Sequence, residues 1–260
     1  MTFPVYLRVF GVSIHPHPFF ETIAYLLGFQ LYRWMRRHYG DKVSTSDRWT
    51  ILAAGAVGAL LGSKLLFLLE DPAQTAQVIR NPALIAQGKT IIGALLFGTI
   101  VVEIAKRFSG IRVRTGDIFA VPLCLGIAIG RIGCFLTGLT DNTYGVATSL
   151  PWGVDFGDGI RRHPTQLYEA AFALLLGAWL WRWLLRPHQQ GDVFRGFMIG
   201  YMGFRLVVDF LKPYPHVFGM AVIQWAALAG VLMYARDLLR WLKGLRDAPL
   251  SPMPEEAHER

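Results

Sequence analysis

The stretch GIAIGRIGCFLTG, residues 126–138, decides which kind of fold the chain adopts. It consists almost wholly of apolar residues and glycine, yet it carries an arginine, Arg131, near its middle. In a soluble core a buried guanidinium is strongly unfavourable, whereas an ionisable residue inside a membrane usually marks a functional site. The first question is therefore which solvent surrounds this segment.

The composition favours a membrane. Of 260 residues 53% are hydrophobic and 17% are charged, and the mean hydropathy is +0.37. A helix needs about 20 residues to cross a bilayer, and the apolar residues come in continuous runs of about that length. We predict an all-α integral membrane protein with about seven transmembrane helices. The predicted spans are 18–35, 50–69, 90–105, 117–137, 168–185, 196–211 and 218–235.

The lysines and arginines predict the orientation. The segments after the first, third, fifth and seventh spans hold seventeen of them, against six in the alternate segments. Because positive charge gathers on the cytoplasmic side, we predict a periplasmic N-terminus and a cytoplasmic C-terminus in a bacterial inner membrane. We expect one membrane domain over 1–247, with a periplasmic loop at about 138–167, and a disordered cytoplasmic tail over 248–260.

Charge and cysteine content narrow the function classes. The net charge of +8 comes from positives that flank the spans, so it indicates contact with anionic lipid headgroups rather than nucleic acid. Cys124 and Cys134 are too far apart on one helix, about 15 Å, to form a disulfide. His15, His17 and His163 lack the spacing of a metal-ligand motif. We therefore expect neither a metal nor a cofactor.

Arg131 has room for a ligand beside it. Gly130 and Gly133 flank it, and glycines let a second helix or a ligand approach the backbone closely. A guanidinium offers a planar fork of donors that matches phosphate oxygens. We predict that Arg131 binds the phosphate of a phospholipid headgroup.

The sixth span carries a second polar face. Tyr201, Arg205 and Asp209 recur every four residues and therefore lie on one side of a helix. Arg205 and Asp209 could simply form an ion pair within the helix. We favour a second phosphate-binding arginine, oriented by Tyr201 and Asp209, because one aspartate does not balance two buried arginines.

Other polar residues extend this site. Arg162 and His163 precede the fifth span, where His163 is a candidate general base and also fits an ordinary loop histidine. Lys64 could extend toward the membrane surface or pair with Glu70, while Glu103 and Lys106 fit a surface ion pair. The remaining candidates for substrate contact are Gln166, Tyr168, Glu169 and Glu21.

Three motifs, GRIGCFLTG, RHPTQLYEA and GYMGFRLVVDF, resemble the prolipoprotein diacylglyceryl transferase family in order and approximate spacing. The resemblance implies a seven-span inner-membrane enzyme that moves the diacylglyceryl group of phosphatidylglycerol to a lipobox cysteine of a prolipoprotein. It implies catalytic or substrate-binding roles for the residues that match the motifs or stand at their positions. These are Lys64, Arg131, Arg162, His163, Gln166, Tyr168, Glu169, Tyr201, Arg205 and Asp209.

The chain also departs from the family pattern. Ile92 stands where the family has a histidine often considered its base, Cys134 replaces an asparagine, and Glu21 or Phe20 replaces a tyrosine. Either His163, Glu21, Asp141 or Asp209 is then the base, or the acceptor is something other than a lipobox cysteine. The alternatives are a non-catalytic phospholipid-binding or assembly protein that keeps the lipid pocket and, third, a transporter.

Overall fold

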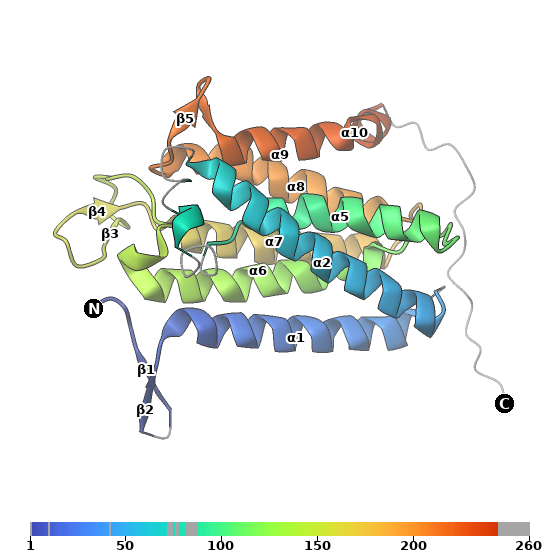
Figure 1. Ribbon diagram of the computed structural model, residues 1–260, viewed down its shortest axis with the longest axis horizontal. Helices are drawn as coiled ribbons and strands as arrows, with labels where there is room; N and C mark the ends of the chain where they lie inside the picture. Colours follow the sequence, from blue (N-terminus) through green and yellow to red (C-terminus); the bar gives the residue numbers. More distant parts are fainter. Residues whose placement is uncertain are drawn as a thin grey trace. The chain divides into compact units, whose positions relative to one another are not determined.

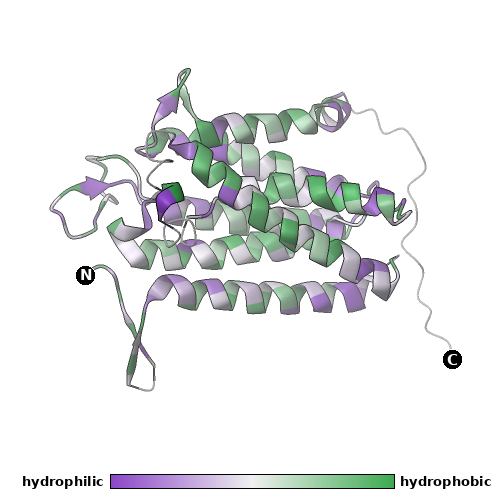
Figure 2. Ribbon diagram, in the orientation of Figure 1, coloured by the Kyte–Doolittle hydropathy of each residue, from purple (hydrophilic) through white to green (hydrophobic). Residues whose placement is uncertain are grey.

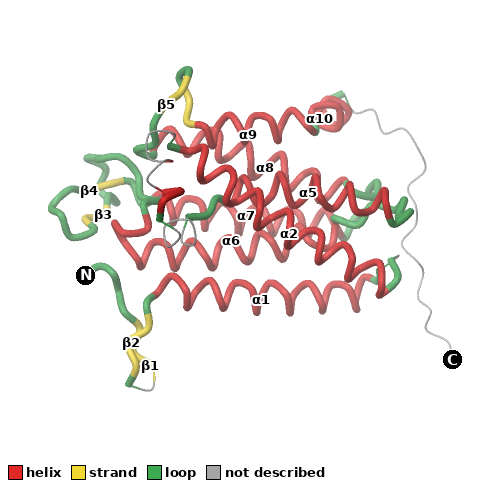
Figure 3. The backbone as a smooth tube through the Cα atoms, in the orientation of Figure 1, coloured by secondary structure: helices red, strands yellow, loops and turns green. Residues whose placement is uncertain are grey.

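The computed structural model describes residues 2–9, 11–41, 43–71, 75, 78–81 and 88–243. The described chain is mostly helical, and its short strands lie before the first helix or in the connections between helices (Figure 3). By internal contacts it divides into two compact units. The first comprises the described residues within 1–40, 114–201 and 234–243, and the second comprises those within 41–113 and 202–233. The single-domain prediction stays a prediction, and the predicted tail lies outside the described residues.

The first unit is built on three long helices, which are labelled in Figure 1. Helix α6 (Asp117–Thr137) packs against both α1 (Pro16–Tyr39) and α7 (Thr165–Leu184). A Cβ on Gly133 would lie 2.6 Å from the Cβ of Phe20, so only glycine permits this approach of α1 to α6. The unit also holds a 3₁₀ turn, η1 (Gly138–Asp141), the start of α8 (Asp192–Val208), and α10 (Ala235–Leu242).

Two antiparallel hairpins belong to the first unit. One pairs β1 (Leu7–Val9) with β2 (Val12–Ile14) just before α1, and the other pairs β3 (Val154–Asp155) with β4 (Arg161–Arg162) in the long loop. Both are absent from the predicted all-α scheme, because strands of two or three residues carry no readable alternation of apolar and polar side chains.

The second unit is centred on α2 (Thr45–Glu70) and α5 (Ile91–Phe108), with α9 (Val222–Met233) packed against both. It also holds the end of α8 and the 3₁₀ turn η2 (Asp209–Leu211). Gly62 and Gly93 face each other across α2 and α5, and a Cβ on Gly62 would lie 2.3 Å from the Gly93 carbonyl oxygen. The two backbones are therefore nearly in contact.

The last predicted span, 218–235, is wrong in its limits. Residues 218–221 belong to a hairpin of β5 (His216–Val217) and β6 (Met220–Ala221), and the helix begins only at Val222. Phe218 and Gly219 turn the chain with φ of +52° and +83°, which a helix does not allow. At the other end the helix ends at Met233, two residues before the end of the predicted span.

The helices have the surface of a membrane protein. Within the described residues, Thr45–Glu70 and Asp117–Asp141 are long and apolar enough to cross a membrane, and the bent pair of α9 and α10 makes a third if taken as one span. Leu60 on α2 and Leu175 on α7 are 61% and 72% exposed, whereas several charged side chains are buried. Figure 2 shows α5 as apolar along most of its length, with hydrophilic residues at its C-terminal end.

Candidate functional site

Arg131 lies in a buried polar network of the first unit. Its Nε is 2.9 Å from Oε1 of Glu169, which projects from the first turns of α7. The hydroxyl of Tyr201, on α8, donates to the same carboxylate oxygen. All three side chains are buried. Glu169 therefore neutralises Arg131, and Tyr201 holds Glu169 in place.

This network corrects the counter-charge argument made from the sequence, which assumed that Asp209 alone faces two buried arginines. Each arginine has a carboxylate of its own, Glu169 for Arg131 and Asp209 for Arg205. The positioning of Glu169 by Tyr201 is a role that the sequence analysis did not assign. The signal for the Glu169 pair was weak, because the two residues belong to different helices.

The two glycines beside Arg131 have different surroundings. Phe20 of α1 occupies the space beside Gly133, so this glycine allows the two helices to pack closely. A Cβ on Gly130, in contrast, would meet no heavy atom within 4 Å. The helix face at Gly130 is therefore the one that leaves space for another molecule.

A second polar cluster joins Cys134 and Asp141, three and ten residues after Arg131 in the chain, to His17 of α1. Nδ1 of His17 is 2.8 Å from a carboxylate oxygen of Asp141, and Nη1 of Arg131 is 3.8 Å from Sγ of Cys134. One ligand atom from each of His17, Cys134 and Asp141 lies within 4.8 Å of the other two. The three residues come from the start of α1, the end of α6 and η1.

The protonation of His17 follows from these contacts. His17 precedes the first predicted span, and its hydrogen bonds to Asp141 and then to Cys134 raise its pKa to about 10, against the opposing effect of burial. The second oxygen of Asp141 accepts a hydrogen bond from Thr143. Glu21 lies 3.8 Å from Nε2 of His17 and also accepts a hydrogen bond from Tyr25.

This cluster was not predicted from the sequence. The histidines lack ligand spacing within any one segment, and the three residues meet only through the packing of α1 on α6. A signal was present, because the predicted topology puts the start of the first span and the end of the fourth on the same side of the membrane.

In the long loop, Arg162 and His163 have local partners. Arg162 pairs with Asp158 at 2.7 Å and lies over the ring of Tyr144. The Arg162 guanidinium holds the pKa of the Asp158 carboxyl below its usual range. Nδ1 of His163 is 3.2 Å from the hydroxyl of Tyr168. These contacts fold the loop onto the start of α7.

Gln166 is the most unusual of the predicted substrate contacts. It is 1% exposed, and neither its side-chain nitrogen nor its oxygen has a hydrogen-bond partner among the described residues. Buried amides are rarely left in this state. Gln166 precedes Glu169 by three residues in α7 and so lies near the same face of the helix.

The second unit holds the other predicted arginine. Nε of Arg205 is 3.1 and 3.0 Å from the two oxygens of Asp209, and Nη2 is 2.8 Å from one of them. Nζ of Lys212 is 3.1 Å from Asp209 as well, and all three side chains are buried. The ion pair of Arg205 with Asp209, which was the less favoured of the two interpretations of the sequence, is thus present, and Lys212 contacts the same carboxylate.

Three further predicted positions fall in the same unit. Nζ of Lys64 donates to the carbonyl oxygen of Gly88 at 2.6 Å. The Glu103–Lys106 ion pair is present at 2.8 Å, although Lys106 is buried. Ile92 is fully buried in α5 and offers no proton acceptor where the resembling family has a histidine.

Comparison with known proteins agrees with the motifs. A sequence model of the prolipoprotein diacylglyceryl transferase family matches residues 4–241. A phosphatidylglycerol–prolipoprotein diacylglyceryl transferase of Bordetella bronchiseptica is 32% identical over 252 residues, covering 88% of this chain and 91% of that protein. One of Clostridium tetani is 29% identical over 244 residues, covering 88% and 94%. The chain therefore belongs to the prolipoprotein diacylglyceryl transferase family.

Proposed function

We propose that this protein transfers the diacylglyceryl group of phosphatidylglycerol to the thiol of a cysteine in a prolipoprotein. The observation that carries the proposal is the buried Arg131, held by Glu169 and Tyr201 beside the open face at Gly130. Family membership supports the reaction type.

In the proposed reaction the thiolate sulfur attacks the carbon of the diacylglyceryl group that is bonded to the phosphate oxygen. A carbon–sulfur bond forms, the carbon–oxygen bond breaks, and the electron pair leaves with the phosphate as glycerol phosphate. Arg131 donates to the phosphate oxygens as negative charge grows on them, and its fixed position avoids reorganisation during the step. Gln166, buried three residues from Glu169, supplies amide groups to the glycerol headgroup.

Arg205 is proposed as a second phosphate-binding cation, and the contacts that support this role lie within the second unit. Asp209 holds the plane of its guanidinium through two oxygens, and Lys212 adds a further positive charge to that carboxylate. Glu70 also interacts electrostatically with both cations, so a phosphate would join a cluster that already holds two carboxylates. His163 and Arg162 are proposed to meet the acceptor peptide through the long loop.

The proposed location is the bacterial inner membrane, crossed several times, with the N-terminus and the loop at 138–167 on the periplasmic side. The bias of lysine and arginine supports this orientation. The apolar helices Thr45–Glu70 and Asp117–Asp141 support insertion.

The test is mass spectrometry on purified protein incubated with phosphatidylglycerol and a synthetic lipobox peptide. The peptide should gain the diacylglyceryl mass while glycerol phosphate is released. Arg131→Ala should lower the rate at least about 100-fold, as removal of a preorganised charge-stabilising donor does. Arg107→Ala, which removes an exposed arginine at the end of α5, should stay near the parent rate. Full activity of Arg131→Ala would refute the proposed role.

The alternative is a non-catalytic phospholipid-binding or assembly protein, and the buried Ile92 favours it. Such a protein would co-purify with intact phospholipid and form neither modified peptide nor glycerol phosphate, with an active family enzyme assayed in parallel as the control. Glycerol phosphate without modified peptide would indicate another acceptor.

A further inference from the structure

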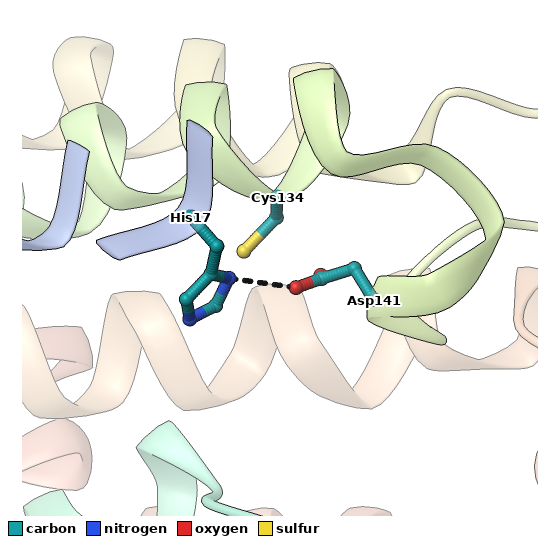
Figure 4. Close-up of side chains that lie close together, drawn as sticks. All are labelled: His17, Cys134 and Asp141. Carbon is teal, nitrogen blue, oxygen red and sulfur yellow. Dashed lines mark ion pairs between the residues drawn. The ribbon is translucent and has the colours of Figure 1, made fainter. Parts of the chain in front are cut away.

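His17, Cys134 and Asp141 converge on one point at the outer ends of α1 and α6. Figure 4 shows the sulfur of Cys134 and the carboxylate of Asp141 both directed toward the same side of the imidazole, with the ion pair drawn to Asp141. One nitrogen, one sulfur and one oxygen thus lie within 4.8 Å of one another. The phosphate-binding role proposed for Arg131 does not use this arrangement.

The donor set suits zinc. Thiolate, imidazole and carboxylate are its usual protein ligands, at about 2.3, 2.0–2.1 and 2.0–2.2 Å. In a tetrahedral site these bond lengths put the ligand atoms about 3.3–3.6 Å apart. The 2.8 Å between His17 and Asp141 is that of a hydrogen-bonded ion pair, so an ion would part these two atoms by about half an ångström, and the sulfur of Cys134, within 4.8 Å of both, would adjust to its own bond length.

The groups around the three residues are also those of a metal site. Ligating histidines usually donate their other ring N–H to a carboxylate, and Glu21, 3.8 Å from Nε2 of His17, would have to approach by about 0.6–1 Å to accept that hydrogen bond. The free oxygen of Asp141 accepts a hydrogen bond from Thr143, which fixes the direction of the carboxylate. With Arg131 neutralised by Glu169, one thiolate and one carboxylate balance a divalent ion.

We propose that His17, Cys134 and Asp141 bind one Zn²⁺ and leave its fourth position open for the thiol of the acceptor. The metal site stands on the geometry alone, whereas the role of the fourth position rests on the proposed function. Three protein ligands with one open position is the arrangement of catalytic rather than structural zinc.

This site supplies what the chain lacks at Ile92. A thiol that coordinates zinc loses its proton, so the acceptor becomes a thiolate without a dedicated base. The proton passes to solvent, and the sulfur then attacks the glycerol carbon as described above. Arg131, 3.8 Å from Cys134, places the phosphate-binding group next to the metal.

The first experiment uses cobalt as a spectroscopic probe on the purified full chain in detergent, stripped of metal. Co²⁺ bound here should give the intense visible bands of a tetrahedral ion and a near-ultraviolet thiolate-to-cobalt band. Zn²⁺ should abolish both at one equivalent per chain. Cys134→Ala should lose the thiolate band and weaken Zn²⁺ binding at least about 100-fold. Cys124→Ala, which removes the other buried cysteine of α6, should behave as the parent.

Absence of a thiolate band in the parent protein, or its persistence in Cys134→Ala, would overturn the site. Because Cys134→Ala could fail to fold, X-ray absorption at the zinc edge of the parent protein provides a second measurement. One sulfur and two to three nitrogen or oxygen neighbours support the site, and a shell without sulfur overturns it.

Transfer to the lipobox peptide is then measured with and without a chelator. Loss of transfer, restored by Zn²⁺ and with phosphatidylglycerol binding unchanged, supports the role of the fourth position. Transfer that persists in the metal-free protein overturns that role while leaving the proposed function intact. If no condition gives transfer, the proposed function fails, and the cobalt spectrum still supports or overturns the metal site by itself.

Discussion

Replacing Glu169 by Gln should destabilise the first unit strongly, since it leaves the Arg131 guanidinium buried without its carboxylate. The side chains are both buried and the Nε–Oε1 distance is 2.9 Å, so water does not replace the lost partner. Breaking a buried pair in this way costs about 3–5 kcal/mol. At about 2–4 °C per kcal/mol for a chain of this size, the melting temperature should fall by about 6–20 °C.

The assay is thermal unfolding of the purified protein in one detergent, followed by size-exclusion of the soluble fraction. Asp158→Asn, which removes an exposed carboxylate paired with Arg162, is the control and should shift Tm far less. The double variant Arg131→Gln with Glu169→Gln removes both charges and should recover about 0.5–3 kcal/mol relative to the sum of the single variants. An unchanged Tm for Glu169→Gln, or strict additivity in the double variant, would refute the pairing argument.

Two further predictions concern packing and pH. Gly62→Ala should destabilise the second unit by about 1–3 kcal/mol, because the added Cβ would meet the Gly93 carbonyl. The control is Gly203→Ala, whose Cβ would meet no heavy atom within 4 Å and which should leave Tm nearly unchanged. Equal Tm values for the two variants would contradict the prediction. Arg162 lowers the pKa of Asp158. The Asp158–Arg162 ion pair therefore contributes fully to loop order above the pKa of Asp158 in the unfolded chain, about 3.9, and this contribution is lost as pH falls through the lower pKa in the folded chain. Hydrogen exchange of the β3–β4 hairpin, normalised to the unstructured rate at each pH, should show protection falling below about pH 4, and Asp158→Asn should show no such step.

Much of this protein was predictable from local sequence. Helical hydrogen bonds join residues four apart, so a run of apolar residues long enough to span a bilayer predicts a helix whatever surrounds it. The Arg205–Asp209 pair was predictable for the same reason, because its spacing is one helical turn. The limits of the last helix were not, since the backbone turn at Phe218 and Gly219 leaves no mark in the apolar pattern.

The partners across helices were decided only by tertiary structure. Which face of α6 meets α7 determines that Arg131 finds Glu169, and this depends on the rotation and register of whole helices. The contact of His17 with Asp141 depends likewise on Phe20 fitting against Gly133, which fixes how α1 lies on α6. Sequence alone determined the membrane character, most of the helices and the family, because these follow from composition and local order. The fold decided which charges meet, because side chains far apart in the chain interact only after the helices have packed.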